Sequence, residues 1–198
     1  MTYNILLTGV GGEGVLVTSV IVARAASLDG NEVRGTQFHG LAQRGGSIPT
    51  HVRFGKKGEV HSPFISRGRA DLILGLEPIE AARACIFADK SRTGFVVDNY
   101  PLKPISVNMG NETYPSIKKI KNMIQPFAKR LVLTESSNLC IEKLGNPIFG
   151  NVMAIGVAFG QGLLPISKAS IIKAIKNTVP RGLEQNMQAF KWGLEYGK

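Results

Sequence analysis

The sequence predicts a three-layer α/β fold with a mostly parallel sheet, an antiparallel hairpin insertion and a helical C-terminal region. Short apolar runs alternate with longer apolar segments of helical spacing, as in strand–helix–strand units. A glycine-rich loop separates the first such pair, and beyond Ser136 the apolar spacing is helical throughout. The 198 residues show no compositional break, so we expect a single domain over residues 1–198.

The N-terminal unit begins with an apolar strand over residues 4–8. A helix follows over residues 13–28 and is closed by Gly30, because glycine is favoured just past a helix end. Residues 32–37 form the next strand, expected to be parallel to the first after a right-handed crossover. This arrangement is Rossmann-like.

Residues 48–54 and 60–65 are two strand-like segments. They flank the turn sequence Gly55-Lys56-Lys57-Gly58, which predicts an antiparallel hairpin and therefore a mixed sheet. A second strand–helix–strand unit follows, over residues 71–76, 78–87 and 94–98.

The last third begins with an excursion over residues 101–114, which is rich in Pro, Asn and Gly. We expect a helix over residues 116–129 and a strand over residues 130–134. Helices then fill the remainder, with breaks at residues 145–147, 162–165 and 179–182.

The composition indicates a globular chain with a strong positive charge. The formal net charge of +10 favours an acidic partner, which charge alone leaves open between nucleic acid, an anionic cofactor and a protein surface. Interleaved aromatics and known nucleic-acid modules are missing, which disfavours nucleic acid. We expect two groups of lysines to be solvated helix faces: Lys118, Lys119 and Lys121, and Lys168, Lys173 and Lys176.

The sequence predicts a cytoplasmic location and no membrane association. Its N-terminus lacks the basic and apolar regions of a secretory signal, and no apolar run approaches the roughly 18 residues of a membrane span.

Cys85 and Cys140 are the only cysteines, which is too few for an iron–sulfur cluster or a disulfide framework. We expect them to be buried free thiols. The histidines His39, His51 and His61 have no recognised zinc spacing, so no metal site is predicted.

Nucleophile elbows and P-loops are absent, and no catalytic residue is assigned. Asp71, Glu77 and Glu80 are candidate bases without a nucleophile beside them. We expect them to cap helices or form internal ion pairs.

Four glycines between the first strand and helix are candidate cofactor-binding or partner-facing residues: Gly9, Gly11, Gly12 and Gly14. They match the GxGxxG spacing, in which glycines permit a tight turn and backbone N–H groups at a helix N-terminus attract phosphate. The alternative is a tight turn that binds no ligand.

Two features weigh against a dinucleotide at this loop. The second strand ends without an acid to hold a ribose hydroxyl, and Glu13 would repel a pyrophosphate. Arg34 favours a 2′-phosphate instead, which leaves an NADP-type dehydrogenase as the alternative enzyme class.

A second polar loop follows the second strand and is expected to share a crevice with the glycine loop. Arg44 would offer a fork of donors to a phosphate or a partner carboxylate, with glycine backbone beside it. The alternative is a structural turn in which Arg44 pairs with Glu77. The candidate residues of this loop are His39, Gln43, Arg44, Gly45, Gly46 and Ser47.

Motifs spread over nearly the whole chain resemble the gamma-type subunit of 2-oxoacid:ferredoxin oxidoreductases. Within that family the pairs Tyr114-Pro115 and Gly145-Asn146 look most like the indolepyruvate type. The motifs are GVGGEG, HGLAQRGGS, THVRFG, SPFISRGRADLILGLEPIEAAR, TYPSI and GNVMAIGVAFG.

The resemblance implies a non-catalytic chain beside a larger alpha subunit. That partner would carry thiamine diphosphate, magnesium and [4Fe-4S] clusters, in a heterodimer or a dimer of heterodimers. The complex would convert a 2-oxoacid to an acyl-coenzyme A and pass electrons to ferredoxin.

The glycine loop departs from the family pattern at one position. The family loop reads GVGGQG, so Glu13 replaces a neutral glutamine. From the family and the charge we hypothesise that both loops face the catalytic subunit, where they could close the active-site cleft or contact coenzyme A, whose phosphates would suit Arg44.

Overall fold

A computed structural model describes residues 2–37, 46–103, 107, 110 and 113–196. The chain forms a six-stranded sheet with the order β2-β3-β1-β4-β5-β6. The strands are β1 (Tyr3–Thr8), β2 (Glu32–Gln37), β3 (Thr50–Gly55), β4 (Leu72–Gly75), β5 (Gly94–Asp98) and β6 (Arg130–Thr134).

The sheet is mixed, as the sequence predicts, and its parallel part comprises β1, β4, β5 and β6. β3 pairs antiparallel with both β1 and β2. The second strand therefore runs in the same direction as the first, but β3 separates them. The predicted unit exists as a crossover, and its two strands are not neighbours.

The hairpin prediction is wrong in its second strand, because residues 60–65 do not form one. Val60 and Ile65 are buried, which explains the apolar pattern. Their backbone groups bond to side chains: the Val60 carbonyl accepts from Arg34 Nε at 2.5 Å, and the Ile65 N–H donates to His51 Nδ1 at 3.1 Å. The apolar residues of this segment are therefore spaced for burial against the protein, and the spacing does not indicate pairing with another strand.

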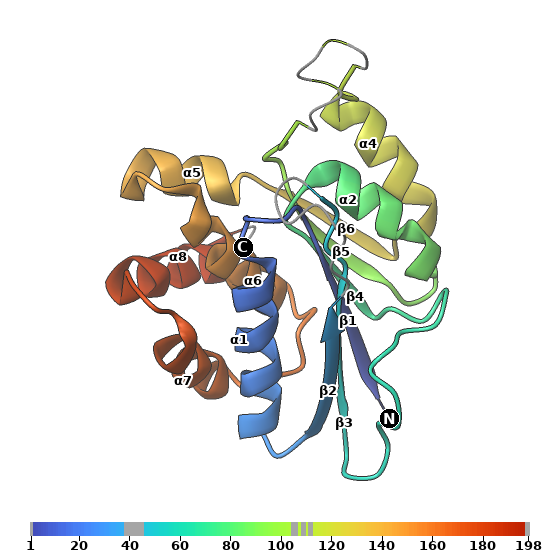
Figure 1. The fold of residues 1–198 in the computed structure, drawn as a ribbon, viewed down its shortest axis with the longest axis vertical. Coiled ribbons are helices and arrows are strands. Elements are labelled where there is room, and N and C mark those ends of the chain that lie inside the picture. The colour runs from blue at the N-terminus through green and yellow to red at the C-terminus, as the bar shows by residue number, and fades with distance from the viewer. Residues whose placement is uncertain (1, 38–45, 104–106, 108–109, 111–112, 197–198) are drawn as a thin grey trace.

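Helices cover both faces of the sheet (Figure 1). One face carries α1 (Val15–Leu28), α6 (Gly150–Gly160), α7 (Lys168–Thr178) and α8 (Leu183–Glu195), and α5 (Ser136–Leu144) packs against α6 and α8. The other face carries α2 (Pro78–Arg83) and α4 (Ile117–Ile124).

Alternating side chains of the strands supply the two cores. Leu6 and Ile73 point to the α2–α4 face, whereas Ile5 and Leu72 point to the α1–α6 face, and all four are buried. This is the period of two that a sheet covered on both faces requires.

Most predicted helix boundaries are confirmed. Gly30 has a φ of +81° and follows the end of α1, and Gly145 with a φ of +74° ends α5. The helices predicted over 78–87 and 116–129 each end in a 3₁₀ turn, at Ala84–Phe87 and Gln125–Phe127. The helix predicted from Glu13 begins two residues later, because Gly14 is its N-cap.

α6 and α8 cross at very close range because glycines face each other. A Cβ at Gly156 would lie 2.5 Å from the Phe190 carbonyl, and one at Gly193 would collide with the Met153 carbonyl. These glycines therefore allow the backbones of α6 and α8 to pack in direct contact. Within the described ranges, no helix combines the length and apolar character needed to span a membrane.

Candidate functional site

The candidate site lies where β1 and β4 run side by side in the sheet. α1 follows β1 onto one face, whereas α2 follows β4 onto the other. The two connections therefore diverge at the carboxyl ends of the strands, the position at which open α/β sheets form a crevice.

The glycine loop lies at this edge and is joined to the end of the second polar loop. Gly12 and Gly14 have φ values of +101° and +81°, a backbone conformation that residues with a Cβ atom rarely adopt. Gly11 N–H donates to the Gly46 carbonyl at 2.8 Å, and Ile48 N–H donates to the Gly9 carbonyl at 2.9 Å. The two loops thus meet through backbone hydrogen bonds.

Glu13 folds back into the glycine loop. Its Oε2 accepts from Val10 N–H at 2.5 Å, and a Cβ at Gly9 would lie only 2.8 Å from the same oxygen. Burial raises the pKa of Glu13 from 4.5 to about 8, and the charges of Glu77, Asp98 and Glu80 raise it further against the Val10 hydrogen bond. The carboxyl group thus takes up one backbone donor of the loop, the Val10 N–H, and the space beside Gly9.

Glu77 and Glu80 are buried beside Glu13 and connect separate segments. Glu77 caps α2 by accepting from Glu80 N–H at 2.8 Å, and it also accepts a hydrogen bond from the Tyr114 hydroxyl. Glu80 accepts from the Ser47 hydroxyl and lies 3.6 Å from the Arg83 guanidinium. The pair therefore anchors both the second loop and the segment before α4.

Asp98 ends β5 and is the fourth carboxylate of this edge. It is only 1% exposed and accepts from Ser137 N–H at the start of α5 at 3.0 Å. Burial raises its pKa to about 6, although the Ser137 hydrogen bonds oppose the shift. Burial likewise raises the pKa of Glu77. This edge of the sheet is a poor host for another anion.

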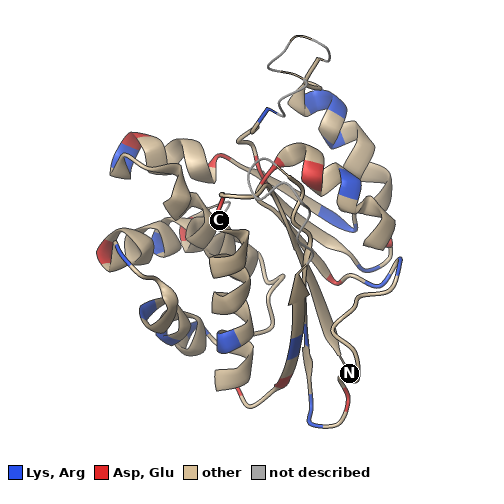
Figure 2. Cartoon of the chain, in the orientation of Figure 1, with Lys and Arg blue, Asp and Glu red and all other residues tan. Residues whose placement is uncertain are grey.

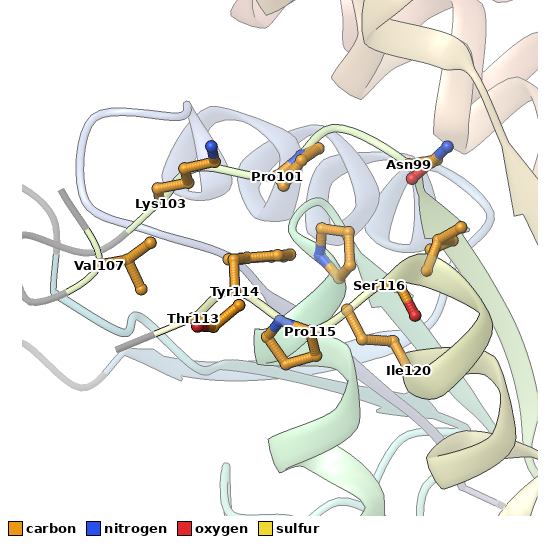
Figure 3. Close-up of a pocket in the computed structure, with 11 residues that line it drawn as sticks. Asn99, Pro101, Lys103, Val107, Thr113, Tyr114, Pro115, Ser116 and Ile120 are labelled. Carbon is orange, nitrogen blue, oxygen red and sulfur yellow. The ribbon is translucent and has the colours of Figure 1, made fainter. Parts of the chain in front are cut away.

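Two cavities adjoin the carboxylates. One of about 220 Å³ opens beside Gly12 and Glu13 and extends to Tyr100, Ser137 and Asn151. Another of about 480 Å³ lies between α2 and α4, where the Tyr114 ring and three prolines form its walls (Figure 3). The segment that carries Tyr114 thus shapes both this cavity and the Glu77 contact.

Arg34 is not placed to read a nucleotide at the glycine loop. Its guanidinium lies 2.9 Å from Glu32 and donates to the Val60 carbonyl. Since β3 separates β2 from β1, the end of the second strand is also not adjacent to the loop. Neither feature supports the NADP alternative.

The thiols do not fit an iron–sulfur cluster. Cys85 and Cys140 are buried free thiols, as predicted, and they belong to different apolar clusters. Burial raises the pKa of Cys85 to about 11 and that of Cys140 to about 12, which disfavours the thiolate that ligates iron. Among the residues with described positions, no group of His, Cys, Asp or Glu has a metal-binding arrangement.

The structure brings together six of the candidate residues, namely Gly9, Gly11, Gly12, Gly14, Gly46 and Ser47. The candidates His39, Gln43, Arg44 and Gly45 lie outside the described residues. Asp71 pairs with Arg92 at 2.5 Å and Glu77 caps α2, which confirms the structural roles predicted for these acids.

Sequence reasoning missed the convergence of Glu13, Glu77, Glu80 and Asp98. A signal was available, because Glu77 and Asp98 stand at the ends of β4 and β5 and Glu13 follows β1. Neighbouring parallel strands bring their carboxyl ends to one edge. The contacts of Ser47 with Glu80 and of Tyr114 with Glu77 could not be predicted in this way, because they depend on the backbone conformation of the loops that carry Ser47 and Tyr114.

The described surface is more basic than the formal charge suggests, because several acids are internal. Lysines and arginines appear along α4 and α7, whereas few acidic residues lie beside them (Figure 2). The lysines predicted on these two helices are exposed: Lys118, Lys119, Lys121, Lys168, Lys173 and Lys176.

Residues 4–196 match the family model described as pyruvate ferredoxin/flavodoxin oxidoreductase. The chain belongs to this family. A relative from Pyrococcus horikoshii, named indolepyruvate oxidoreductase subunit IorB, is 37% identical over 99% of this chain and 96% of its own length. The 2-oxoglutarate synthase subunit KorC of Methanocaldococcus jannaschii is 27% identical over 100% of this chain and 95% of its own length.

A solved structure has the same fold. The gamma subunit of a keto/oxoacid ferredoxin oxidoreductase from Geobacter sulfurreducens superimposes with a TM-score of 0.67 and 25% identity. The match covers 98% of this chain and 96% of that chain. The family resemblance found in the sequence motifs is thereby confirmed.

Proposed function

We propose that this chain is the non-catalytic subunit of an indolepyruvate-type 2-oxoacid:ferredoxin oxidoreductase. The observation that carries the proposal is the similarity, over nearly the full length of both chains, to a subunit named for indolepyruvate. In the complex a 2-oxoacid is oxidatively decarboxylated to an acyl-coenzyme A, and electrons pass to ferredoxin. The proposal includes a cytoplasmic location.

The proposed division of labour assigns the reacting groups to a larger alpha subunit. Thiamine diphosphate, magnesium and [4Fe-4S] clusters would supply decarboxylation and electron transfer there. Support comes from this chain's own donors: Cys85 and Cys140 are buried in separate clusters and have raised pKa values. Neither thiol is suited to ligate a cluster.

This chain would contribute a surface at the carboxyl edge of its sheet. The glycine loop and residues 46–48 are joined there by backbone hydrogen bonds, and Glu77 and Glu80 anchor the adjoining segments. A preassembled edge of this kind lowers the ordering cost of docking. We assign the loops at Gly11–Gly14 and at residues 39–47 to the contact with the alpha subunit.

We propose that coenzyme A meets this chain through Arg44 and not through the glycine loop. Glu13 occupies the loop and three further carboxylates surround it, which disfavours phosphates. Arg44→Ala should lower activity or coenzyme A affinity of the complex without loss of folding. Steady-state constants equal to those of the unchanged complex would remove Arg44 from the proposal.

We further propose that the 2-oxoacid substrate is indolepyruvate. Indolepyruvate is favoured over 2-oxoglutarate because identity is 37% to the indolepyruvate-named relative and 27% to the 2-oxoglutarate-named one. Pyruvate remains a further candidate.

The test is co-expression of the chain with its co-purifying alpha subunit, followed by assay of ferredoxin reduction. We expect activity highest with indolepyruvate, lower with pyruvate and 2-oxoglutarate, and none from this chain alone. Activity of the isolated chain would overturn the subunit role. A preference for pyruvate or 2-oxoglutarate would overturn the substrate while leaving the role intact.

A further inference from the structure

We propose that this chain holds a binding site for a small apolar carboxylate, in the cavity enclosed by α1, α6 and the connection between α7 and α8. The cavity measures about 370 Å³, within the range of small-molecule sites. Every residue that lines it lies in a described part of the chain. The proposal rests on these residues alone and does not depend on the function proposed above.

The walls of the cavity are apolar. Val17 and Ile21 project from α1, Phe149 and Val152 from the start of α6, and Val179 from the end of α7. A cavity of roughly 150 Å³ lined by such side chains is enough to bind benzene. The volume here therefore accommodates a phenyl or indole ring with a short substituent.

Arg181 gives the cavity its charge preference. It lines the cavity, is solvent-exposed, and forms no ion pair with any residue whose position is described. The lining contains no aspartate or glutamate. An arginine side chain that lines an apolar cavity is complementary to a planar carboxylate, which a guanidinium can bind through two parallel hydrogen bonds.

Each amide in the lining makes at least one hydrogen bond within the protein, and Arg181 is the one charged side chain among these described lining residues. Asn186 donates to the Gly182 carbonyl at 2.8 Å, and Asn151 donates to the Glu13 carbonyl. Asn146 accepts from Ile148 N–H at 2.9 Å. The ligand class that fits is therefore an aryl or branched-alkyl carboxylate, with its ring or branch in the chamber and its carboxylate on Arg181.

The site adjoins the edge described above. Asn146, Ile148 and Asn151 also line the 220 Å³ cavity beside Glu13. A bound carboxylate would thus lie next to the glycine loop, because Gly14 also lines the cavity.

Isothermal titration calorimetry of the full chain tests the site, with indole-3-acetate as the probe and uncharged indole-3-acetamide as its counterpart. We expect one acetate per chain with a submillimolar Kd, and an affinity about tenfold weaker for the acetamide. Arg181→Gln should weaken the acetate about tenfold and leave the acetamide unchanged. These differences correspond to about 1.4 kcal/mol.

Two variants make the result specific. Lys176→Gln removes an exposed charge outside the cavity and should leave both affinities unchanged, which excludes a general effect of the positive net charge. Val17→Phe fills the chamber and should abolish binding of both probes, with circular dichroism to verify the fold.

Three outcomes would overturn the proposal. They are undetectable binding at millimolar probe, equal affinity for the charged and uncharged probes, and an Arg181→Gln variant that binds acetate normally.

Discussion

Two regions of this chain depend on glycine for different reasons, the Gly9–Gly14 loop and the crossing of α6 with α8. At the crossing, Gly156 and Gly193 remove side chains so that two helix backbones can touch. In the loop, Gly12 and Gly14 supply left-handed backbone, and Gly9 leaves room for the Glu13 carboxyl group. The comparison teaches that a glycine motif specifies a backbone path, and its neighbours decide whether a ligand fits.

The two regions also differ in charge. The crossing packs the apolar helix α6 against the apolar face of α8, with Met153 and Phe190 fully buried beside the glycines. In the loop, burial raises the pKa of Glu13, and the charges of the buried Glu77, Asp98 and Glu80 raise it further. The crossing is therefore stabilised by close packing. In the loop, the neighbouring carboxylates repel one another, and protonation or a positively charged partner would reduce that repulsion.

The largest effect is expected at the crossing. Gly193→Ala places a Cβ against the Met153 carbonyl and the backbone of α6, which cannot move without separating the helices. We expect a loss of about 3 kcal/mol in the free energy of unfolding, measured by urea denaturation. Gly58→Ala is the control, because its Cβ would meet open space; its left-handed backbone alone should cost about 1 kcal/mol. Equal losses would contradict close packing as the reason for Gly193.

The next effect concerns the proton on Glu13. Since folding raises its pKa from 4.5 to about 8, the folded chain binds this proton more tightly than the unfolded chain. The free energy of unfolding should therefore fall as the pH rises from 4.5 to about 8. Glu13→Gln removes this titration and should stabilise the chain by about 1–3 kcal/mol at pH values above that window.

Urea denaturation across the same pH range measures the Glu13→Gln effect. The difference between variant and native chain should grow from acid to alkaline pH. A difference that is constant with pH would show that Glu13 is already ionised in the folded chain, and the loop would not be strained.

A smaller effect is expected at Tyr114. Tyr114→Phe removes the hydroxyl that donates to the buried Glu77 carboxylate, and we expect a loss of about 1 kcal/mol in the free energy of unfolding. Tyr100→Phe is the matched control, because Tyr100 lines the neighbouring cavity without a hydrogen bond from its hydroxyl to a described residue. If both variants lose the same stability, the Glu77 contact does not anchor the segment.

The sequence predicted those parts of the fold that depend on local pattern. Sequence patterns located all six strands, although β2 with the sequence EVRGTQ is not an apolar run, and Gly30 and Gly145 marked helix ends because of their backbone freedom. The insertion of β3 between β1 and β2 could not be predicted, because strand pairing is decided by long-range contacts. Residues 60–65 show the same limit, since buried apolar residues need not pair as a strand.

The candidate site was predicted in part for a comparable reason. The glycines of the first loop and the adjacent Ser47 were found from sequence, and they do meet. The backbone hydrogen bond from Val10 to Glu13 was missed, because the direction of the Glu13 side chain depends on the space left by Gly9. The sequence showed an acidic residue in the loop, but not that its carboxyl group folds back into the loop.

The most direct test of the account is hydrogen–deuterium exchange on this chain alone and in complex with its alpha subunit. We predict that assembly slows exchange in residues 9–14 and 46–48, while the α6–α8 crossing keeps the same protection in both states. Slower exchange confined to α7 and α8, with the glycine loop unchanged, would contradict the claim that the carboxyl edge of the sheet is the partner-facing surface.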